Sequence, residues 1–213
     1  VVYVLWSLSL AFVARARAKP LKPFTPVRYV DVGVGLGDCS LAAAALLPDG
    51  ALHGVALDAN PEGLDHLRAS AVLNGVRIVG PGEVGAGARR SRGEASTLEL
   101  RHALLGPPSL AGSKVALTTN YAGFNNTYVH GIQPPGFAGS SSTMVFSTLD
   151  DEFQDFEGQI DLLSMFVNGM DASVMEGAEG LLRSQRIACV MVEGTNNTHG
   201  ADRPPCDVRQ RHG

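Results

Sequence analysis

The sequence predicts an α/β domain with a mostly parallel sheet and helices on both of its faces. Three observations predict it. Strand-like and Ala/Leu-rich helical segments alternate between residues 28 and 79, an order typical of parallel strands joined by crossover helices. A glycine-rich turn follows the first strand. The 213 residues, 45% of them apolar, are enough for one domain with a sizeable core.

The first half of the chain contains the clearest elements. The expected elements are a strand over 28–34, a helix over 38–47, a strand over 51–59, a helix over 61–73 and a strand over 76–79. The second helix has the clearest start, because Asn60 suits the N-cap and Pro61 suits the first helical position.

The second half has longer loops. Its expected elements are strands over 97–104, 115–119, 144–149, 160–167 and 187–192 and a helix over 172–184. The polar, Gly/Pro-rich stretch 121–142 is expected to be a loop, and loops of this length usually serve as a lid or a binding loop, or are disordered.

The ends of the chain differ from this domain, which is expected to occupy 27–193. Residues 1–26 form an apolar segment and a Pro-punctuated linker. The apolar run 1–14 is too short to span a bilayer, which leaves a truncated membrane anchor and an amphipathic or buried helix as alternatives. The polar tail 194–213 is expected to be disordered. Localisation and oligomeric state stay open.

Charge and cysteine content exclude several functional classes. Lys and Arg number 17 against 21 Asp and Glu, a net charge of −4, so the chain offers no basic surface for nucleic acid. Cys39, Cys189 and Cys206 have neither zinc-ligand spacing nor the even count of a disulfide framework. The six histidines form no spaced cluster with carboxylates or thiols, so no metal site is expected.

The stretch YVDVGVGLGD, residues 29–38, predicts a binding site for a nucleotide-like ligand. Gly33, Gly35 and Gly37 lie between a strand and a helix, where the missing side chains let the backbone approach a ligand. The spacing is not the Gly-x-Gly-x-x-Gly of dinucleotide sites. Asp31 would repel a pyrophosphate but suits a positive ligand such as S-adenosylmethionine. The alternatives are a tight turn without a ligand and, for Asp31, a buried hydrogen-bond acceptor.

Asp58 ends the second expected strand. An acid at this position can accept hydrogen bonds from both ribose hydroxyls of a nucleoside. The alternative is a surface turn residue. Together with the glycines, Asp58 strengthens the prediction of a nucleoside-containing ligand.

Four blocks follow one another along the chain: YVDVGVGLGDCSL (29–41), GVALDANPEGLDHLRASAVLNGV (54–76), STLDD (147–151) and IDLLSMFVNGMDASVMEGAEGLL (160–182). In sequence and in order they resemble the FkbM-type S-adenosylmethionine-dependent methyltransferases, over about residues 29–193. The resemblance implies a Rossmann-like sheet and methyl transfer from S-adenosylmethionine to a hydroxyl of a small molecule or sugar. The expected cofactor-binding residues are Asp31, Gly33, Gly35, Gly37 and Asp58.

The chain departs from the family at three ionisable positions. Ser164, Phe166 and Asn168 stand where the family's pattern has Lys, Asp and Glu. Phe166 cannot accept a proton from an attacking hydroxyl, so no catalytic residue is assigned and a catalytically inactive, methyltransferase-like binding module is the alternative. A C-terminal hairpin of the common methyltransferase sheet is expected to be missing. The glycine spacing disfavours a nicotinamide-dependent oxidoreductase.

Overall fold

The computed structural model describes residues 26–47, 52–83, 95–120, 126–129 and 136–192. The predictions for the apolar N-terminal run, for the polar tail and for a missing C-terminal hairpin concern residues outside these ranges. Within them, no helix is both long and apolar enough to cross a membrane.

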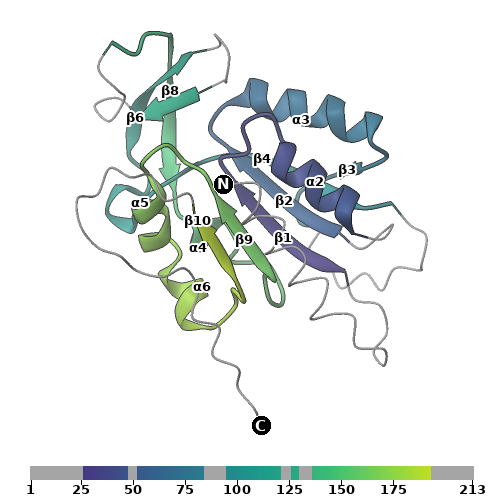
Figure 1. Cartoon of the computed structure of the whole chain (residues 1–213). Helices are drawn as coiled ribbons and strands as arrows, with labels where there is room; N and C mark the ends of the chain where they lie inside the picture. Colours follow the sequence, from purple (N-terminus) through teal and green to yellow (C-terminus); the bar gives the residue numbers. More distant parts are fainter. Residues whose placement is uncertain (1–25, 48–51, 84–94, 121–125, 130–135, 193–213) are drawn as a thin grey trace, which may run out of the picture.

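The main sheet confirms the predicted Rossmann-like α/β fold. Its six strands have the order β10-β9-β1-β2-β4-β3, and every pairing is parallel (Figure 1). The strands are β1 (Val27–Val32), β2 (Leu52–Asp58), β3 (Arg77–Val79), β4 (Thr97–His102), β9 (Leu162–Met165) and β10 (Val190–Val192). The chain moves from β1 to β2 on one side, and β9 later pairs with β1 on the other.

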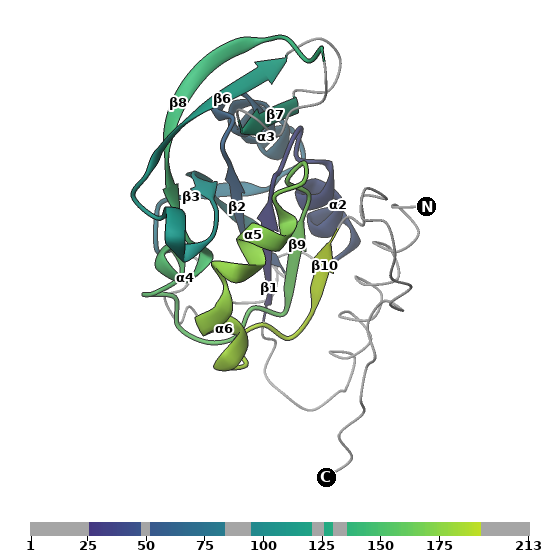
Figure 2. The same ribbon diagram turned by 90° about the vertical axis from the view of Figure 1, so that its left-hand side faces the viewer.

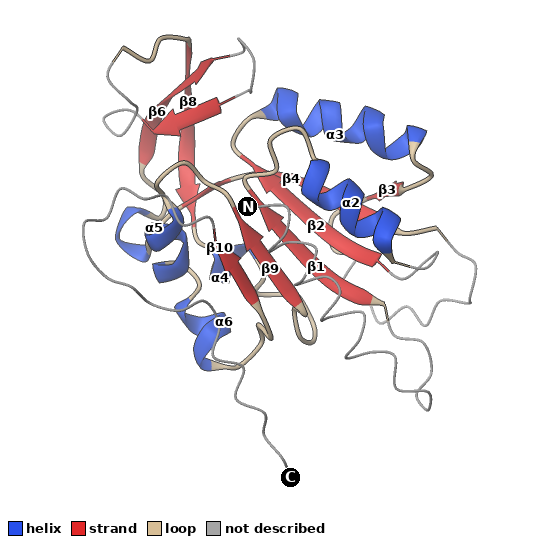
Figure 3. Cartoon of the chain, viewed as in Figure 1, coloured by secondary structure: helices blue, strands red, loops and turns tan. Residues whose placement is uncertain are grey.

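Helices cover both faces of this sheet, and each face has its own core (Figure 3). The helices are α2 (Asp38–Leu46), α3 (Pro61–Leu73), α4 (Leu149–Glu152), α5 (Asp171–Glu176) and α6 (Glu179–Arg183). Because successive strand residues point to opposite faces, Tyr29 belongs to the same core as Ala43 of α2 and Leu67 of α3. Val30 belongs to the other core, with Val174 of α5.

Helix α3 begins where the sequence predicts. The side-chain oxygen of Asn60 accepts a hydrogen bond from the amide of Glu62 at 3.1 Å, and Pro61 is the first helical residue. This pairing satisfies one of the amides that the first turn of a helix leaves without a partner.

A second, smaller sheet corrects the prediction of one long loop over 121–142. Its strand order is β5-β8-β6-β7, with β5 (Leu104–Leu105), β6 (Lys114–Asn120), β7 (Asn126–Val129) and β8 (Ser140–Ser147). Figures 1 and 2 show β6 and β8 beyond one end of the main sheet. Strand β7 has only four residues, too few for a pattern in the sequence, and it exists because β6 pairs with it.

The helix expected over 172–184 is two helices, α5 and α6. A Cβ on Gly177, between them, would overlap the carbonyl oxygen of Gly106, so glycine is needed for this close approach. The Gly177 carbonyl accepts a hydrogen bond from the amide of Asp150 at 2.8 Å. The Asp150 carboxylate in turn accepts from the amides of Gly180 and Leu181. Contacts with the α4 region therefore separate the two helices.

Strands β9 and β10 are shorter than the expected 160–167 and 187–192. Ile160 and Ile187 form only an isolated bridge at the start of this pair. A short region η1 (Pro108–Leu110) of 3-10 helix connects β5 to β6.

Candidate ligand-binding site

A cavity of about 250 Å³ lies at the carboxyl ends of β1, β2 and β9. This is where the strand order changes direction, since β2 and β9 flank β1 on opposite sides. Ligands of open α/β sheets bind in the crevice at such a point. The second sheet contributes to the opposite wall through Leu117 and residues 127–129.

The three glycines of the loop after β1 have positive φ angles but different neighbours. A Cβ on Gly33 would lie 2.8 Å from the carbonyl carbon of Phe166, and one on Gly37 would lie 2.5 Å from a methyl group of Leu67. Gly33 thus lets the end of β9 lie close to the loop after β1, and Gly37 lets α3 lie close to the same loop. Gly35 lines the cavity, and a Cβ there would meet no atom within 4 Å. Gly35 therefore leaves space open toward a ligand.

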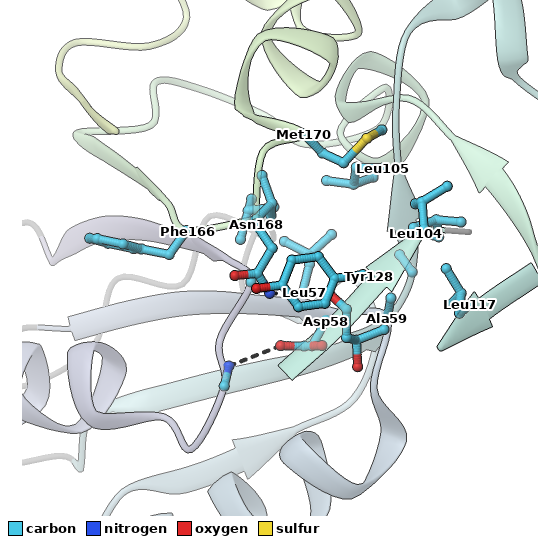
Figure 4. Close-up of a pocket in the computed structure, with 17 residues that line it drawn as sticks. Leu57, Asp58, Ala59, Leu104, Leu105, Leu117, Tyr128, Phe166, Asn168 and Met170 are labelled. Carbon is cyan, nitrogen blue, oxygen red and sulfur yellow. Dashed lines mark hydrogen bonds between the residues drawn. The ribbon is translucent and has the colours of Figure 1, made fainter. Parts of the chain in front are cut away.

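Asp58, at the end of β2, is half-buried and lines the cavity. Its Oδ2 accepts a hydrogen bond from the amide of Gly35 at 2.9 Å, and its Oδ1 accepts from the amide of Asn60 at 2.7 Å (Figure 4). Burial raises the pKa of Asp58, while the amides of Asn60 and Gly35 oppose this change. Each carboxylate oxygen can accept a further hydrogen bond, so the group can still bind hydroxyls of a ligand.

Asp31 lies behind the cavity rather than in its lining. It is 1% exposed, and its carboxylate accepts hydrogen bonds from the hydroxyls of Ser40 at 2.6 Å and Ser164 at 2.7 Å. The hydroxyl of Tyr29 donates to Ser164 at 3.0 Å. Burial raises the pKa of Asp31, and these hydroxyls oppose this change. The alternation along β1 points Asp31 toward α2. The structure thus brings Gly33, Gly35 and Asp58 to the cavity, but not Asp31 or Gly37.

The three positions that depart from the family pattern have separate locations. Ser164 is buried beside Asp31, whereas Phe166 and Asn168 line the cavity. Asn168 has a left-handed backbone with φ of 49°. Its side-chain amide donates a hydrogen bond to the carbonyl of Thr127 at 3.1 Å. This bond connects the loop after β9 to β7 of the second sheet, so Asn168 holds two walls of the cavity together.

Sequence reasoning missed Tyr128, which lies in the stretch expected to be a loop. Figure 4 shows three side chains that reach into the cavity. Tyr128 comes from β7, Asn168 from the loop after β9, and Asp58 from the end of β2. Only the pairing of β7 with β6 brings Tyr128 there, and the sequence contains no signal for that pairing.

The cavity has little charge. Among the described residues that line it, Asp58 is the only charged one. In the same part of the chain, no group of three or more His, Cys, Asp or Glu side chains could hold a metal ion. The lining therefore suits an uncharged or positively charged ligand better than an anion.

Comparison of the chain with protein-family models, with curated protein sequences and with solved structures finds no match. Only the lining of the cavity and the resemblance of the four sequence blocks to the methyltransferases therefore point to a function.

Proposed function

We propose that this chain binds S-adenosylmethionine in the cavity and transfers its methyl group to a hydroxyl oxygen of a small molecule or sugar. The observation that supports this most is the position of Asp58. It stands at the carboxyl end of β2, hydrogen-bonded to Gly35 across the point where the strand order changes direction. A carboxylate there can accept the two ribose hydroxyls of a nucleoside.

The rest of the lining fits the same ligand. Gly35 leaves open space where any side chain would project, and Asp58 gives the cavity a negative charge that favours a cation. When bound, S-adenosylmethionine would supply a methyl group from its positively charged sulfur. A C–O bond to the acceptor would form as the C–S bond breaks, S-adenosylhomocysteine would leave, and the hydroxyl proton would pass to solvent, since the described lining offers no general base. The chain's contribution is to hold the reacting groups in position and to exclude water with its apolar wall, and positioning alone lowers a reaction barrier substantially.

A catalytically inactive binding module is the second candidate function. Asp58 is the only ionisable carboxylate or amine among the described lining residues, and both of its oxygens already accept backbone amides. Phe166 and Asn168 offer no general base. Ligand binding without methyl transfer would follow from this arrangement.

Asp58→Asn is expected to weaken the binding of S-adenosylmethionine and S-adenosylhomocysteine by on the order of 10- to 100-fold, the range for hydrogen bonds to a charged group. The amide has nearly the same shape, but its nitrogen cannot accept a hydrogen bond. Calorimetric titration measures both affinities. Asp155→Asn removes the same charge from an exposed position outside the cavity and is expected to change neither.

Two outcomes would contradict the donor site. One is no binding by wild-type protein that unfolds cooperatively, and the other is equal binding by wild type and Asp58→Asn. If the donor binds, incubation with methyl-labelled S-adenosylmethionine and a panel of alcohols and sugars separates the two candidate functions. Labelled product supports a methyltransferase, whereas no label on any acceptor supports the binding module.

A further inference from the structure

We propose that the part of the cavity wall contributed by the second sheet binds the acceptor of the methyl group. This methyl acceptor is an uncharged molecule with an apolar body and a hydroxyl that Tyr128 orients. This inference rests on the proposed function, because the donor would occupy the side of the cavity at Gly35 and Asp58. Such a wall favours small-molecule alcohols over the sugars that the proposed function also includes.

The side of the cavity away from Gly35 is apolar. Leu104, Leu105 and Leu117 are buried and line it, together with Val129 and Met170. Figure 4 shows Leu104, Leu117 and Met170 on the far side of the cavity from the hydrogen bond between Gly35 and Asp58. Burying an apolar group against such a surface is favourable in proportion to the area removed from water. A sugar would instead place several hydroxyls against side chains that cannot pair with them, which is costly.

Several polar groups of the lining already have partners. The hydroxyl of Thr127 lies 3.0 Å from the hydroxyl of Thr119, and the Thr127 carbonyl accepts the hydrogen bond from Asn168. Both oxygens of Asp58 accept amides. Within the described residues, no hydrogen bond is made by the hydroxyl of Tyr128 or by the side-chain oxygen of Asn168, whose amide nitrogen donates to Thr127. These two groups can supply only a few polar contacts to the acceptor molecule, which suits an alcohol with few hydroxyls.

The position of Tyr128 is held by its neighbours. Its ring packs edge-to-face with Phe137, with the ring centroids 4.7 Å apart and an angle of 70° between the planes. Its backbone lies in the β7–β6 ladder opposite Thr118. A tyrosine hydroxyl both donates and accepts hydrogen bonds, so Tyr128 can orient the oxygen of an alcohol. Tyr128 would therefore contact the acceptor molecule directly.

The charge of the lining also selects among acceptors. No described lining residue is Lys, Arg or His, so a phosphate or carboxylate group would lie near Asp58 without a compensating cation. An anion is therefore disfavoured by repulsion and by the loss of its hydration.

The test compares three probes: benzyl alcohol, toluene, which has nearly the same shape without the hydroxyl, and glucose. Their dissociation constants are measured by ligand-observed NMR titration, with and without saturating S-adenosylhomocysteine. Wild-type protein is expected to bind benzyl alcohol about two- to tenfold more tightly than toluene, the range for one neutral hydrogen bond. Glucose is expected to bind more weakly than either.

Tyr128→Phe removes only the hydroxyl and is expected to abolish the preference for benzyl alcohol over toluene. Val129→Thr keeps the shape of the side chain but adds a hydroxyl to the apolar wall, so it is expected to weaken both aromatic probes by about threefold or more. Val115→Thr is the matched control, because Val115 is also half-buried in the second sheet but does not line the cavity. The thermal midpoint of each variant checks that it folds.

The results separate the two proposals. If S-adenosylhomocysteine does not bind, the donor proposal fails, and the probe preference measured without it still decides the role of Tyr128. The inference is overturned if glucose binds more tightly than benzyl alcohol, or if folded Tyr128→Phe keeps the wild-type preference. The inference is supported if the preference for benzyl alcohol over toluene disappears in Tyr128→Phe but persists in Val115→Thr.

Discussion

Gly33→Ala is expected to lower the free energy of unfolding by about 3–5 kcal/mol, near the upper end for single substitutions. Gly33 has φ of +77°, a conformation that costs an L-residue about 1–2 kcal/mol. The added methyl group would also overlap the backbone carbonyl of Phe166. That backbone cannot move away freely, because the amide of Phe166 donates to the carbonyl of Val32 at 2.9 Å. The strain therefore falls on the pairing of β1 with the end of β9.

Urea unfolding of wild type, Gly33→Ala and Gly35→Ala measures this effect. Gly35 also has a positive φ, +59°, but a Cβ there meets no atom within 4 Å. Gly35→Ala is therefore expected to cost only the conformational part, about 1–2 kcal/mol. Equal losses for the two variants would show that the contact with Phe166 does not decide the need for glycine at position 33.

Asp31→Asn is expected to make the protein less sensitive to pH, with a stability gain over wild type that grows as pH rises. Burial raises the pKa of Asp31 in the folded protein. Below the unfolded pKa of about 3.9, the carboxyl is protonated in both states and carries no penalty. At a pH between the pKa of Asp31 in the unfolded protein and its higher pKa in the folded protein, Asp31 is protonated in the folded state but ionised in the unfolded state. Wild-type stability then falls by up to about 1.4 kcal/mol per pH unit relative to the neutral amide.

The comparison is between denaturant unfolding curves of wild type and Asp31→Asn from pH 4 to 8. The amide can accept from Ser164 and donate to Ser40 after rotation of that hydroxyl, so the hydrogen-bonded cluster around position 31 is kept. Asp155→Asn is the control for net charge, since Asp155 is exposed. If the free energies of unfolding of wild type and Asp31→Asn differ by the same amount at every pH in this range, folding does not raise the pKa of Asp31.

Much of the main sheet could be predicted from local patterns. The alternation from β1 to β3 follows from short β-branched runs and Ala/Leu-rich segments, and the start of α3 follows from Asn60 and Pro61, which act within one helical turn. The order of the strands in the sheet could not be predicted from such local patterns. Strand β4 inserts between β2 and β3, although β3 precedes it in the sequence, because strand pairing depends on contacts between distant segments.

The candidate site was predicted in part. Gly33, Gly35 and Asp58 lie at the ends of parallel strands, and the carboxyl ends of such strands meet at one edge of a sheet. Asp31 is near these residues in the sequence, which predicts that it shares their site, but its place in β1 directs it to Ser40 and Ser164 behind the cavity. That the cavity binds S-adenosylmethionine stays a prediction.

The class of fold, the start of α3 and the glycine-rich turn between β1 and α2 follow from local sequence, because each depends on residues close together in the chain. The break between α5 and α6 and the wall that Tyr128 and Leu117 form opposite Asp58 depend instead on tertiary contacts. The break requires the close approach of Gly177 to Gly106, and the wall requires β7 to pair with β6. Both contacts join segments that are separate in the chain, and the local sequence of each segment does not indicate its partner.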